Sequence, residues 1–309
     1  MNKAGVVATS GPGFRSGFVA IIGRPNVGKS TLLNRLIGQK VSITSPRAQT
    51  TRHRILGIHS TAEAQIVFVD TPGLHGGESD KQLNRLMNRE ARTSLEGVDA
   101  VVLVMTADGW TERDEPALQA VRQATCPVIL AINKVDRIKN RERLLPLLEA
   151  MQQRHRFAEI VPLSAQSGDN LPALEKIILN LLPVHPAYFE ADQITDRSDR
   201  FQAAEFVREQ VFRRFGEEVP YAVAVEITEF REEPKHQHIE AVIWVEKEGQ
   251  KAILIGKGGA SLKDIGRGAR LEMQKAFGRK VYLGLWVKVR EGWSNDARAL
   301  KSLGYQEQD

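Results

Sequence analysis

Gly23-Arg24-Pro25-Asn26-Val27-Gly28-Lys29-Ser30 is the stretch that decides the fold of this chain. It directly follows the apolar run Phe18–Ile22 and opens an amphipathic segment, so it predicts a strand, a glycine-rich loop and a helix in succession. The backbone N–H groups of such a loop and the N-terminus of the helix bind phosphate oxygens. In this motif Lys29 reaches the outer phosphates, Ser30 ligates Mg²⁺, and Thr31 completes the expected nucleotide-binding set.

Short apolar runs alternate with helix-like segments from Phe18 to about Leu182. The runs are nearly continuous in apolar character, which is typical of strands in a parallel sheet that is covered on both faces. This alternation predicts a doubly wound α/β domain, in which ligands bind at the carboxyl ends of the strands. The predicted strands are Phe18–Ile22, Gln65–Val69, Ala100–Met105, Val128–Ile132 and Glu159–Leu163, and the predicted helices include Ser30–Leu36, Gln82–Leu95, Glu115–Ala124 and Arg141–Gln153.

A second motif, Asp70-Thr71-Pro72-Gly73, comes immediately after the run Gln65–Val69. On its own such a string is usually only a turn, but here it stands at the end of a predicted strand. Asp70 is placed to hold Mg²⁺, directly or through water, and the Gly73 amide is placed to contact a terminal phosphate. The two motifs together predict a site for a nucleotide and Mg²⁺.

A third motif, Asn133-Lys134-Val135-Asp136, follows the run Val128–Ile132 and concerns the base. A carboxylate at Asp136 accepts both the ring N–H and the exocyclic amine of guanine, a donor pair that adenine does not present. Ser164-Ala165, after the last predicted strand, is expected to add a backbone contact to the base. Three motifs in this order, each at a strand end, predict a guanine nucleotide site.

These motifs resemble the translation-factor class of P-loop GTPases. The stretch from Ser45 to Arg54 is similar to the first switch loop of that class, in which a threonine closes on Mg²⁺ and the γ-phosphate. The arginine that follows Thr51 aligns Thr51 with this threonine. Thr50 is the alternative candidate. A purely structural alternative is that Thr50 and Thr51 are two β-branched residues at the start of a strand. The resemblance implies that Lys29, Thr51 and Gly73 act in GTP hydrolysis and that Ser30, Thr51 and Asp70 hold Mg²⁺.

Two positions bear on how GTP is hydrolysed. Leu74 stands where Ras-like proteins carry a water-orienting glutamine, directly after the second motif. Because leucine cannot orient water, we expect slow intrinsic hydrolysis, with the water positioned by the backbone, the first switch loop or a partner. Asn26 resembles the asparagine by which some relatives bind K⁺ beside the phosphates, so K⁺ as an activator besides Mg²⁺ is a hypothesis.

A second domain follows a proline-marked segment, 183–188, which does not favour a continuing helix. We expect a flexible tail at 1–16, the nucleotide domain at 17–182, a linker at 183–198, and the second domain with a C-terminal tail at 199–309. The predicted order of the second domain is α+β: a helix (Arg200–Phe215), two strands (Tyr221–Ile227 and Ile239–Lys247), a glycine cluster, a helix (Ser261–Phe277) and a strand (Val281–Val289).

The glycine cluster lies in the most basic part of the chain. Its GxxG loop lets the backbone approach nucleic-acid phosphates closely. From Lys251 to Arg290 ten basic residues stand against two acidic ones, although the whole chain has a net charge of only +5. A solvated helix face beside a tight turn, or a membrane-surface patch, has the same pattern, but charge concentrated at the loop favours RNA. The expected RNA-binding residues are Ile255, Gly256, Lys257, Gly258, Gly259, Lys263, Arg267 and Arg270.

The element order of this domain resembles a type II KH domain, and the runs 291–296 and 303–305 are similar to the end of bacterial GTPases that carry one. The resemblance implies GTP and GDP, small-subunit ribosomal RNA near its 3′ end and the pre-30S particle as partners, and a role in small-subunit assembly. It also implies a cytoplasmic protein that is partly peripheral on the inner membrane, in contact with anionic lipid. No DNA partner is expected.

Other functions fit the sequence less well. A related GTPase that acts in large-subunit assembly, or that couples growth to division at the membrane, is the nearest alternative. A metabolic P-loop kinase requires a lid and an acceptor site, which we do not find, and a passive RNA-binding module makes no use of a guanine-specific motif. The chain has no run of about 18 apolar residues, and its single cysteine, Cys126, makes no internal disulfide, which fits a reducing compartment.

Overall fold

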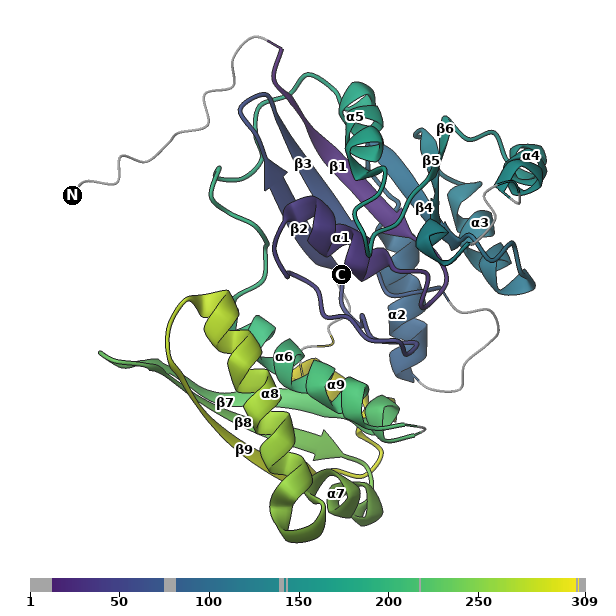
Figure 1. Ribbon diagram of the computed structural model, residues 1–309. Coiled ribbons are helices and arrows are strands. Elements are labelled where there is room, and N and C mark those ends of the chain that lie inside the picture. Colours follow the sequence, from purple (N-terminus) through teal and green to yellow (C-terminus); the bar gives the residue numbers. More distant parts are fainter. Residues whose placement is uncertain are drawn as a thin grey trace. The chain divides into compact units, whose positions relative to one another are not determined.

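The chain divides into two units in the computed structural model (Figure 1). The structure describes residues 13–74, 82–138, 142, 144–216, 218–303 and 305. The first unit comprises Met1–Ser42, Thr51–Gly77 and Met87–Asp196, and the second comprises Ile43–Thr50, Glu78–Leu86 and Arg197–Asp309. The last boundary falls inside the predicted linker. Residues 1–12 of the expected tail at 1–16 lie outside the described residues, as do the start of the expected helix at Arg141 and the end of the chain at 306–309.

The first unit is built on a six-stranded sheet of order β2-β3-β1-β4-β5-β6, in which only β2 is antiparallel to its neighbour. Helices α1 and α5 pack on one face of the sheet, and α2, α3 and α4 pack on the other. The predicted doubly wound, mostly parallel α/β fold is therefore confirmed. The elements are β1 (Arg15–Ile22), α1 (Lys29–Ile37), β2 (Ile55–Ser60), β3 (Ala64–Asp70), α2 (Gln82–Thr93), β4 (Ala100–Thr106), α3 (Glu115–Val121), β5 (Val128–Asn133), α4 (Leu144–Arg154), β6 (Glu159–Pro162) and α5 (Leu171–Leu181).

The central strands are buried on both faces, as their apolar sequences predict. Every residue of β3, β4 and β5 is buried, so the residues that follow these strands lie at the edge of a rigid sheet. Two details differ from the prediction. Strand β1 begins at Arg15, inside the expected tail, because Arg15 pairs with Ala64 of β3 and with Val184. Strand β2 was not expected, and it forms the antiparallel edge of the sheet.

Much of the predicted linker lies along the first unit. Thr195 forms a β-bridge with Gly57 of β2, and the N–H of Ile58 donates to the carbonyl of Ile194 at 2.9 Å. The Gln65 side chain accepts hydrogen bonds from the N–H groups of Tyr188 and Phe189. These contacts order the segment that precedes α6.

The second unit has a three-stranded sheet of order β7-β8-β9, with β7 antiparallel and β9 parallel to β8. Residues of α6, α7 and α8 share one apolar core with this sheet, which confirms the predicted α+β arrangement. Strand β7 begins three residues later than expected because Val219–Ala222, which contains Pro220, forms a 3-10 turn. Helices α7 and α9 were not expected. The elements are α6 (Asp199–Arg214), β7 (Ala224–Glu232), β8 (Gln237–Val245), α7 (Glu248–Ile255), α8 (Ala260–Phe277), β9 (Val281–Val289) and α9 (Ala297–Ser302).

Candidate functional site

The loop between β1 and α1 has the backbone of a phosphate-binding loop. Gly23, Asn26 and Gly28 have φ values of 156°, 65° and 102°, and the chain enters α1 at Lys29. A Cβ on Gly28 would lie 2.3 Å from Nδ2 of Asn133, so glycine is required there on steric as well as conformational grounds. The third motif therefore packs directly on the first.

Lys29 is held inside this loop. Its side chain is buried, and Nζ donates to the carbonyl oxygens of Gly23 at 2.9 Å and Arg24 at 3.0 Å. Burial lowers the pKa of Lys29 to about 8; the carboxylate of Asp70 opposes this shift and the cation of Arg24 adds to it. A phosphate group next to Nζ supplies the negative charge that a buried ammonium lacks.

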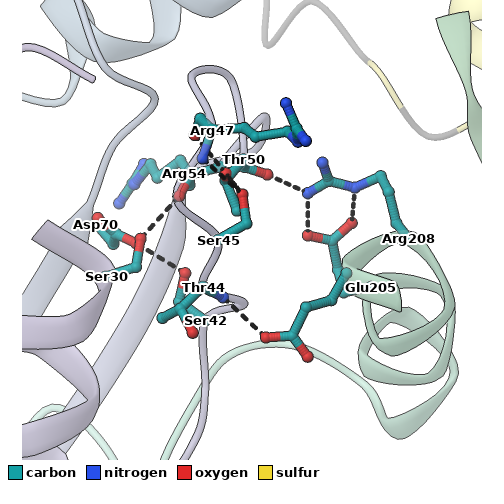
Figure 2. Close-up of polar contacts among 12 residues, drawn as sticks. Ser30, Ser42, Thr44, Ser45, Arg47, Thr50, Arg54, Asp70, Glu205 and Arg208 are labelled. Carbon is teal, nitrogen blue, oxygen red and sulfur yellow. Dashed lines mark hydrogen bonds and ion pairs between the residues drawn. The ribbon is translucent and has the colours of Figure 1, made fainter. Parts of the chain in front are cut away.

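Four oxygen-bearing side chains meet beside Lys29. The hydroxyls of Ser30 and Ser42 each donate to Oδ2 of Asp70 at 2.9 Å (Figure 2). Oγ of Ser30 lies 2.8 Å from Oγ1 of Thr51. Asp70 is fully buried, and its Oδ1 has no hydrogen-bond partner among the described residues. Burial raises the pKa of Asp70, against the opposing effect of Lys29. An orphaned carboxylate oxygen among hydroxyl oxygens fits Mg²⁺, which prefers such hard ligands.

The two candidate threonines of the first switch loop differ in their contacts. The hydroxyl of Thr51 lies at Ser30, next to Asp70. That of Thr50 instead bonds Oγ of Ser45 at 2.6 Å and the carbonyl of Arg47 at 2.8 Å. This geometry favours Thr51 as the residue that reaches the Mg²⁺ position.

The second motif lies against the phosphate loop. A Cβ on Gly73 would be 2.8 Å from the backbone nitrogen of Pro25, which brings the Gly73 backbone next to the phosphate loop. The hydroxyl of Thr71 donates to the carbonyl of Ile21, so this side chain links β3 to β1. Leu74 is buried in the apolar core and offers no polar group.

The residues expected at the base form one hydrogen-bonded group. Asn133 donates to the carbonyl of Val27 at 2.8 Å and accepts from the N–H of Ala165 at 2.9 Å. Oδ1 of Asp136 accepts a hydrogen bond of 2.5 Å from the hydroxyl of Ser164, and the carboxylate is exposed. Lys134 donates from Nζ to the carbonyl of Asn26 at 2.5 Å. The structure thus joins all three motifs.

Sequence reasoning missed two residues of this site. Ser42 bonds Asp70 from the loop after α1, where nothing in the local sequence marks it. Asp114 accepts a hydrogen bond of 2.8 Å from Nε of Arg24 and is 3% exposed. The only sequence signal is the pattern Thr111-x-x-Asp114, which indicates a helix cap and forms one here. The Arg24 side chain is thus oriented by Asp114, and its carbonyl accepts from Nζ of Lys29.

The second unit presents an exposed row of cations beside the GxxG loop. Gly256, Gly258 and Gly259 have φ values of 70°, 60° and 78° and connect α7 to α8. Lys257 and three residues of one α8 face, Lys263, Arg267 and Arg270, are exposed, and within the described chain none of the four has a carboxylate within 4.0 Å. Ile255 is half-buried at the edge of the apolar core. Unpaired cations at a glycine loop can bind a polyanion.

Two domain families match the chain in the expected order. Residues 18–134 match the model of a family described as 50S ribosome-binding GTPase. Residues 218–294 match the model of the KH domain. The first match spans the three nucleotide-site motifs up to Lys134, and the second spans the GxxG loop.

Several relatives match the chain over nearly its whole length. GTPase Era of Stenotrophomonas maltophilia (strain K279a) is 56% identical over 290 residues, which cover 94% of this chain and 97% of that protein. The structure of Era in complex with MgGDPNP and nucleotides 1506–1542 of 16S ribosomal RNA has a TM-score of 0.91 and 44% identity, and the match covers 94% of this chain and 99% of that one. The structure of a point variant of Aquifex aeolicus Era bound to GDP and AlF4⁻ has a TM-score of 0.90 and 43% identity, and the match covers 94% of this chain and 99% of that one.

Proposed function

Because the chain belongs to the Era family of GTPases, we propose that it binds small-subunit ribosomal RNA through its KH domain and uses its nucleotide state to assist assembly of the small ribosomal subunit. The chain is a GTPase: it binds GTP and hydrolyses it to GDP and phosphate. The observation that carries the RNA part is the row of unpaired cations beside the GxxG loop. The Era complex with 16S ribosomal RNA nucleotides 1506–1542 supports it.

Each part of the nucleotide site has a role in this proposal. Ser30, Thr51 and Asp70 hold Mg²⁺, and the bound ion supplies positive charge to the phosphate oxygens. Lys29 and the loop amides bind the phosphates, and the Gly73 amide contacts the terminal phosphate. Asp136 reads guanine, with its carboxylate oriented by Ser164. The relative bound to MgGDPNP supports Mg²⁺ as the resident ion.

Intrinsic hydrolysis is slow in this proposal because no side chain at position 74 orients water. Leu74 is 2% exposed and packs into the core that contains Ala20 and Ile22. A buried aliphatic group donates and accepts no hydrogen bond, so the attacking water depends on backbone groups, the first switch loop or a partner.

Potassium is a second proposed activator. The Asn26 side chain is exposed at the phosphate loop, and its backbone is in the left-handed region at φ 65°. If its amide oxygen binds K⁺ beside the phosphates, turnover in K⁺ should exceed turnover in Na⁺ by about 10-fold, since one ion that stabilises developing charge is worth roughly 1.4 kcal/mol or more. Steady-state GTP hydrolysis in the two salts measures this.

Two variants sharpen the potassium test. Asn26→Gly tolerates the positive φ and lacks the amide, so its K⁺ preference should disappear. Asn26→Asp keeps an oxygen at the same place and should retain the preference. Equal turnover of the parent chain in K⁺ and Na⁺ would contradict the proposal.

RNA binding is tested by removing cations from α8. In the variant Lys263→Ala, Arg267→Ala, Arg270→Ala, we expect the slope of log K against log salt concentration to fall by about 2, because each phosphate contact of a single strand contributes about 0.7. The ligand is an RNA of 16S nucleotides 1506–1542, titrated at several salt concentrations with MgGDPNP present.

A matched control comes from the first unit. Lys176 is an exposed cation of α5, and Lys176→Ala should leave both the affinity and the salt slope unchanged. An unchanged slope in the α8 variant, with normal nucleotide binding, would show that these cations face solvent only. Binding of double-stranded DNA with the same affinity as RNA would argue against the proposed partner.

The alternatives make different predictions. The description of the matched GTPase family names the 50S subunit, but that match spans 18–134 and so concerns the nucleotide domain alone. Association with large-subunit rather than small-subunit particles in sedimentation would favour this alternative. No helix in the described part of the chain is long and apolar enough to cross a membrane. Peripheral contact of the α8 cations with anionic lipid remains a proposal that co-sedimentation with anionic vesicles tests.

A further inference from the structure

The middle of the first switch loop is part of the second unit. Residues Ile43–Thr50 group with that unit, while Ser42 before them and Thr51 after them belong to the first. Ile43 is 2% exposed and lies in the same apolar core as Phe206 and Val207 of α6. An aliphatic side chain buried in this way anchors the start of the segment through the hydrophobic effect.

Helix α6 binds the backbone of this segment at both ends. The N–H of Thr44 donates to Oε1 of Glu209 at 3.0 Å. The guanidinium of Arg208 donates to the carbonyl of Thr50 (Figure 2). Between them, Nε of Arg47 donates to the carbonyl of Phe212 at 3.0 Å. Because the two outer bonds are made to backbone atoms of the loop, they fix its path irrespective of its side chains.

Two of the α6 residues that bind the segment, Arg208 and Glu209, are buried and charged. Arg208 is 1% exposed and Glu209 is 0% exposed. Glu205 pairs with Arg208, with Oε1 2.7 Å from Nε and Oε2 2.5 Å from Nη2. Buried charges are costly unless they are paired and hydrogen-bonded, and apolar residues of similar size often stabilise a fold better. This suggests a role for these charges beyond stability.

The bond from Arg208 is directed to the peptide group that precedes Thr51. The carbonyl of Thr50 and the nitrogen of Thr51 belong to one planar unit, so fixing the carbonyl also fixes the plane from which Thr51 begins. In the same structure the hydroxyl of Thr51 lies 2.8 Å from Oγ of Ser30, at the Mg²⁺ position. The anchored segment therefore ends at the residue that reaches the ion.

We propose that Arg208 and Glu209 are positioning residues for the GTPase reaction: from the second unit they hold Ile43–Thr50 so that Thr51 is presented to Mg²⁺ and the γ-phosphate. The inference rests on the proposed role of Thr51. Without this hold, GTP must itself order the part of the segment that becomes free, and this entropic cost weakens its binding. GDP, which has no γ-phosphate for Thr51 to contact, does not bear this cost.

The test compares GTP-analogue and GDP affinities in the full chain with Mg²⁺. In the double variant Glu205→Gln, Arg208→Met, which removes both charges of the ion pair together, we expect GDPNP affinity to fall about 10-fold and GDP affinity to stay within about 2-fold, a coupling of ordinary size. The turnover number should fall as well. Arg214→Met is the matched control, because Arg214 lies on the same helix and its guanidinium donates to Gln210.

A second pair of variants covers the case in which the double variant does not fold. Glu209→Gln keeps an oxygen that accepts the Thr44 N–H and should leave the GDPNP-to-GDP affinity ratio near that of the parent. Glu209→Leu removes the acceptor and should lower the ratio about 10-fold. A change in stability alone weakens both nucleotides together, so the ratio separates positioning from a structural role.

Thr51→Ala separates the proposed role of Thr51 from the proposed positioning by α6. If Thr51→Ala leaves the GDPNP-to-GDP ratio unchanged, the proposed role of Thr51 is wrong. If Thr51→Ala lowers the ratio while folded Glu209→Leu and the double variant do not, the role of Thr51 stands and the positioning by α6 is overturned. Equal losses of GDPNP and GDP affinity in the α6 variants would also overturn it.

Discussion

Replacement of Lys29 by alanine is expected to lower GTP affinity about 100-fold, with the fold retained. The Nζ atom is buried inside the phosphate loop, where it donates to the carbonyls of Gly23 and Arg24. A hydrogen-bonded charge pair with phosphate oxygens in such a buried place is worth about 3 kcal/mol, which corresponds to that factor. Titration with a fluorescent GTP analogue in the presence of Mg²⁺ measures the loss.

The depressed pKa of Lys29 explains why the fold should tolerate this change. Burial lowers that pKa to about 8, so the free protein gains little from the ammonium and its removal should shift the free energy of unfolding by about 1 kcal/mol or less. RNA binding by the nucleotide-free variant serves as the internal control, because the α8 cations are untouched. A variant that binds GTP like the parent would show that Lys29 does not contribute to phosphate binding.

The chemistry of the nucleotide site was predictable because each motif is local in sequence. The phosphate loop, Asp70-Thr71-Pro72-Gly73 and Asn133-Lys134-Val135-Asp136 each follow an apolar strand. Carboxyl ends of parallel strands meet at one edge of a sheet, so the sequence also predicts that the motifs come together. The bond from Asn133 to Val27 and the steric need for Gly28 are the structural expression of that convergence.

Pairings between distant residues were not predictable. Arg24 and Asp114 are 90 residues apart, and Thr50 and Arg208 are 158 apart. A buried arginine or glutamate on a helix has the same local pattern as an exposed one, so nothing in α6 distinguished Arg208 or Glu209. Edge strand β2 was not predicted either. Its residues Ile55–Ser60 directly follow the stretch that resembles a switch loop, and they were interpreted as part of that loop region.

Ile43 lies within the predicted first domain in sequence, but it belongs to the second unit in the structure. Its neighbours in sequence, from Lys40 to Ser45, read as the loop after a helix of the first domain. Its side chain is nevertheless buried with Phe206 and Val207. Domain limits predicted from sequence are continuous ranges, so they do not assign a short internal segment such as Ile43–Thr50 to the other unit. This assignment follows from the tertiary packing.

Asp136→Asn is expected to change base preference rather than merely weaken binding. Guanine offers two donors, N1–H and the exocyclic amine, to the two carboxylate oxygens. An asparagine amide still accepts from N1–H but places its own NH₂ against the amine, so GTP affinity should fall about 1000-fold, somewhat below the values for fully buried sites because Asp136 is exposed. Xanthine has a carbonyl in place of that amine, so XTP should become the tighter ligand.

Competition among GTP, XTP and ATP for the variant and the parent separates base recognition from folding. Ser164→Ala is the matched control: it removes the hydroxyl that bonds Oδ1 of Asp136 but leaves both carboxylate oxygens, so it should cost about 10-fold in GTP affinity without a change in preference. Asp136→Asn protein that loses GTP, XTP and ATP equally would mean that the carboxylate supports the loop instead of reading the base. The inversion between GTP and XTP is the outcome that only a direct contact with the base produces, because no change in loop stability distinguishes an amine from a carbonyl at the same ring position.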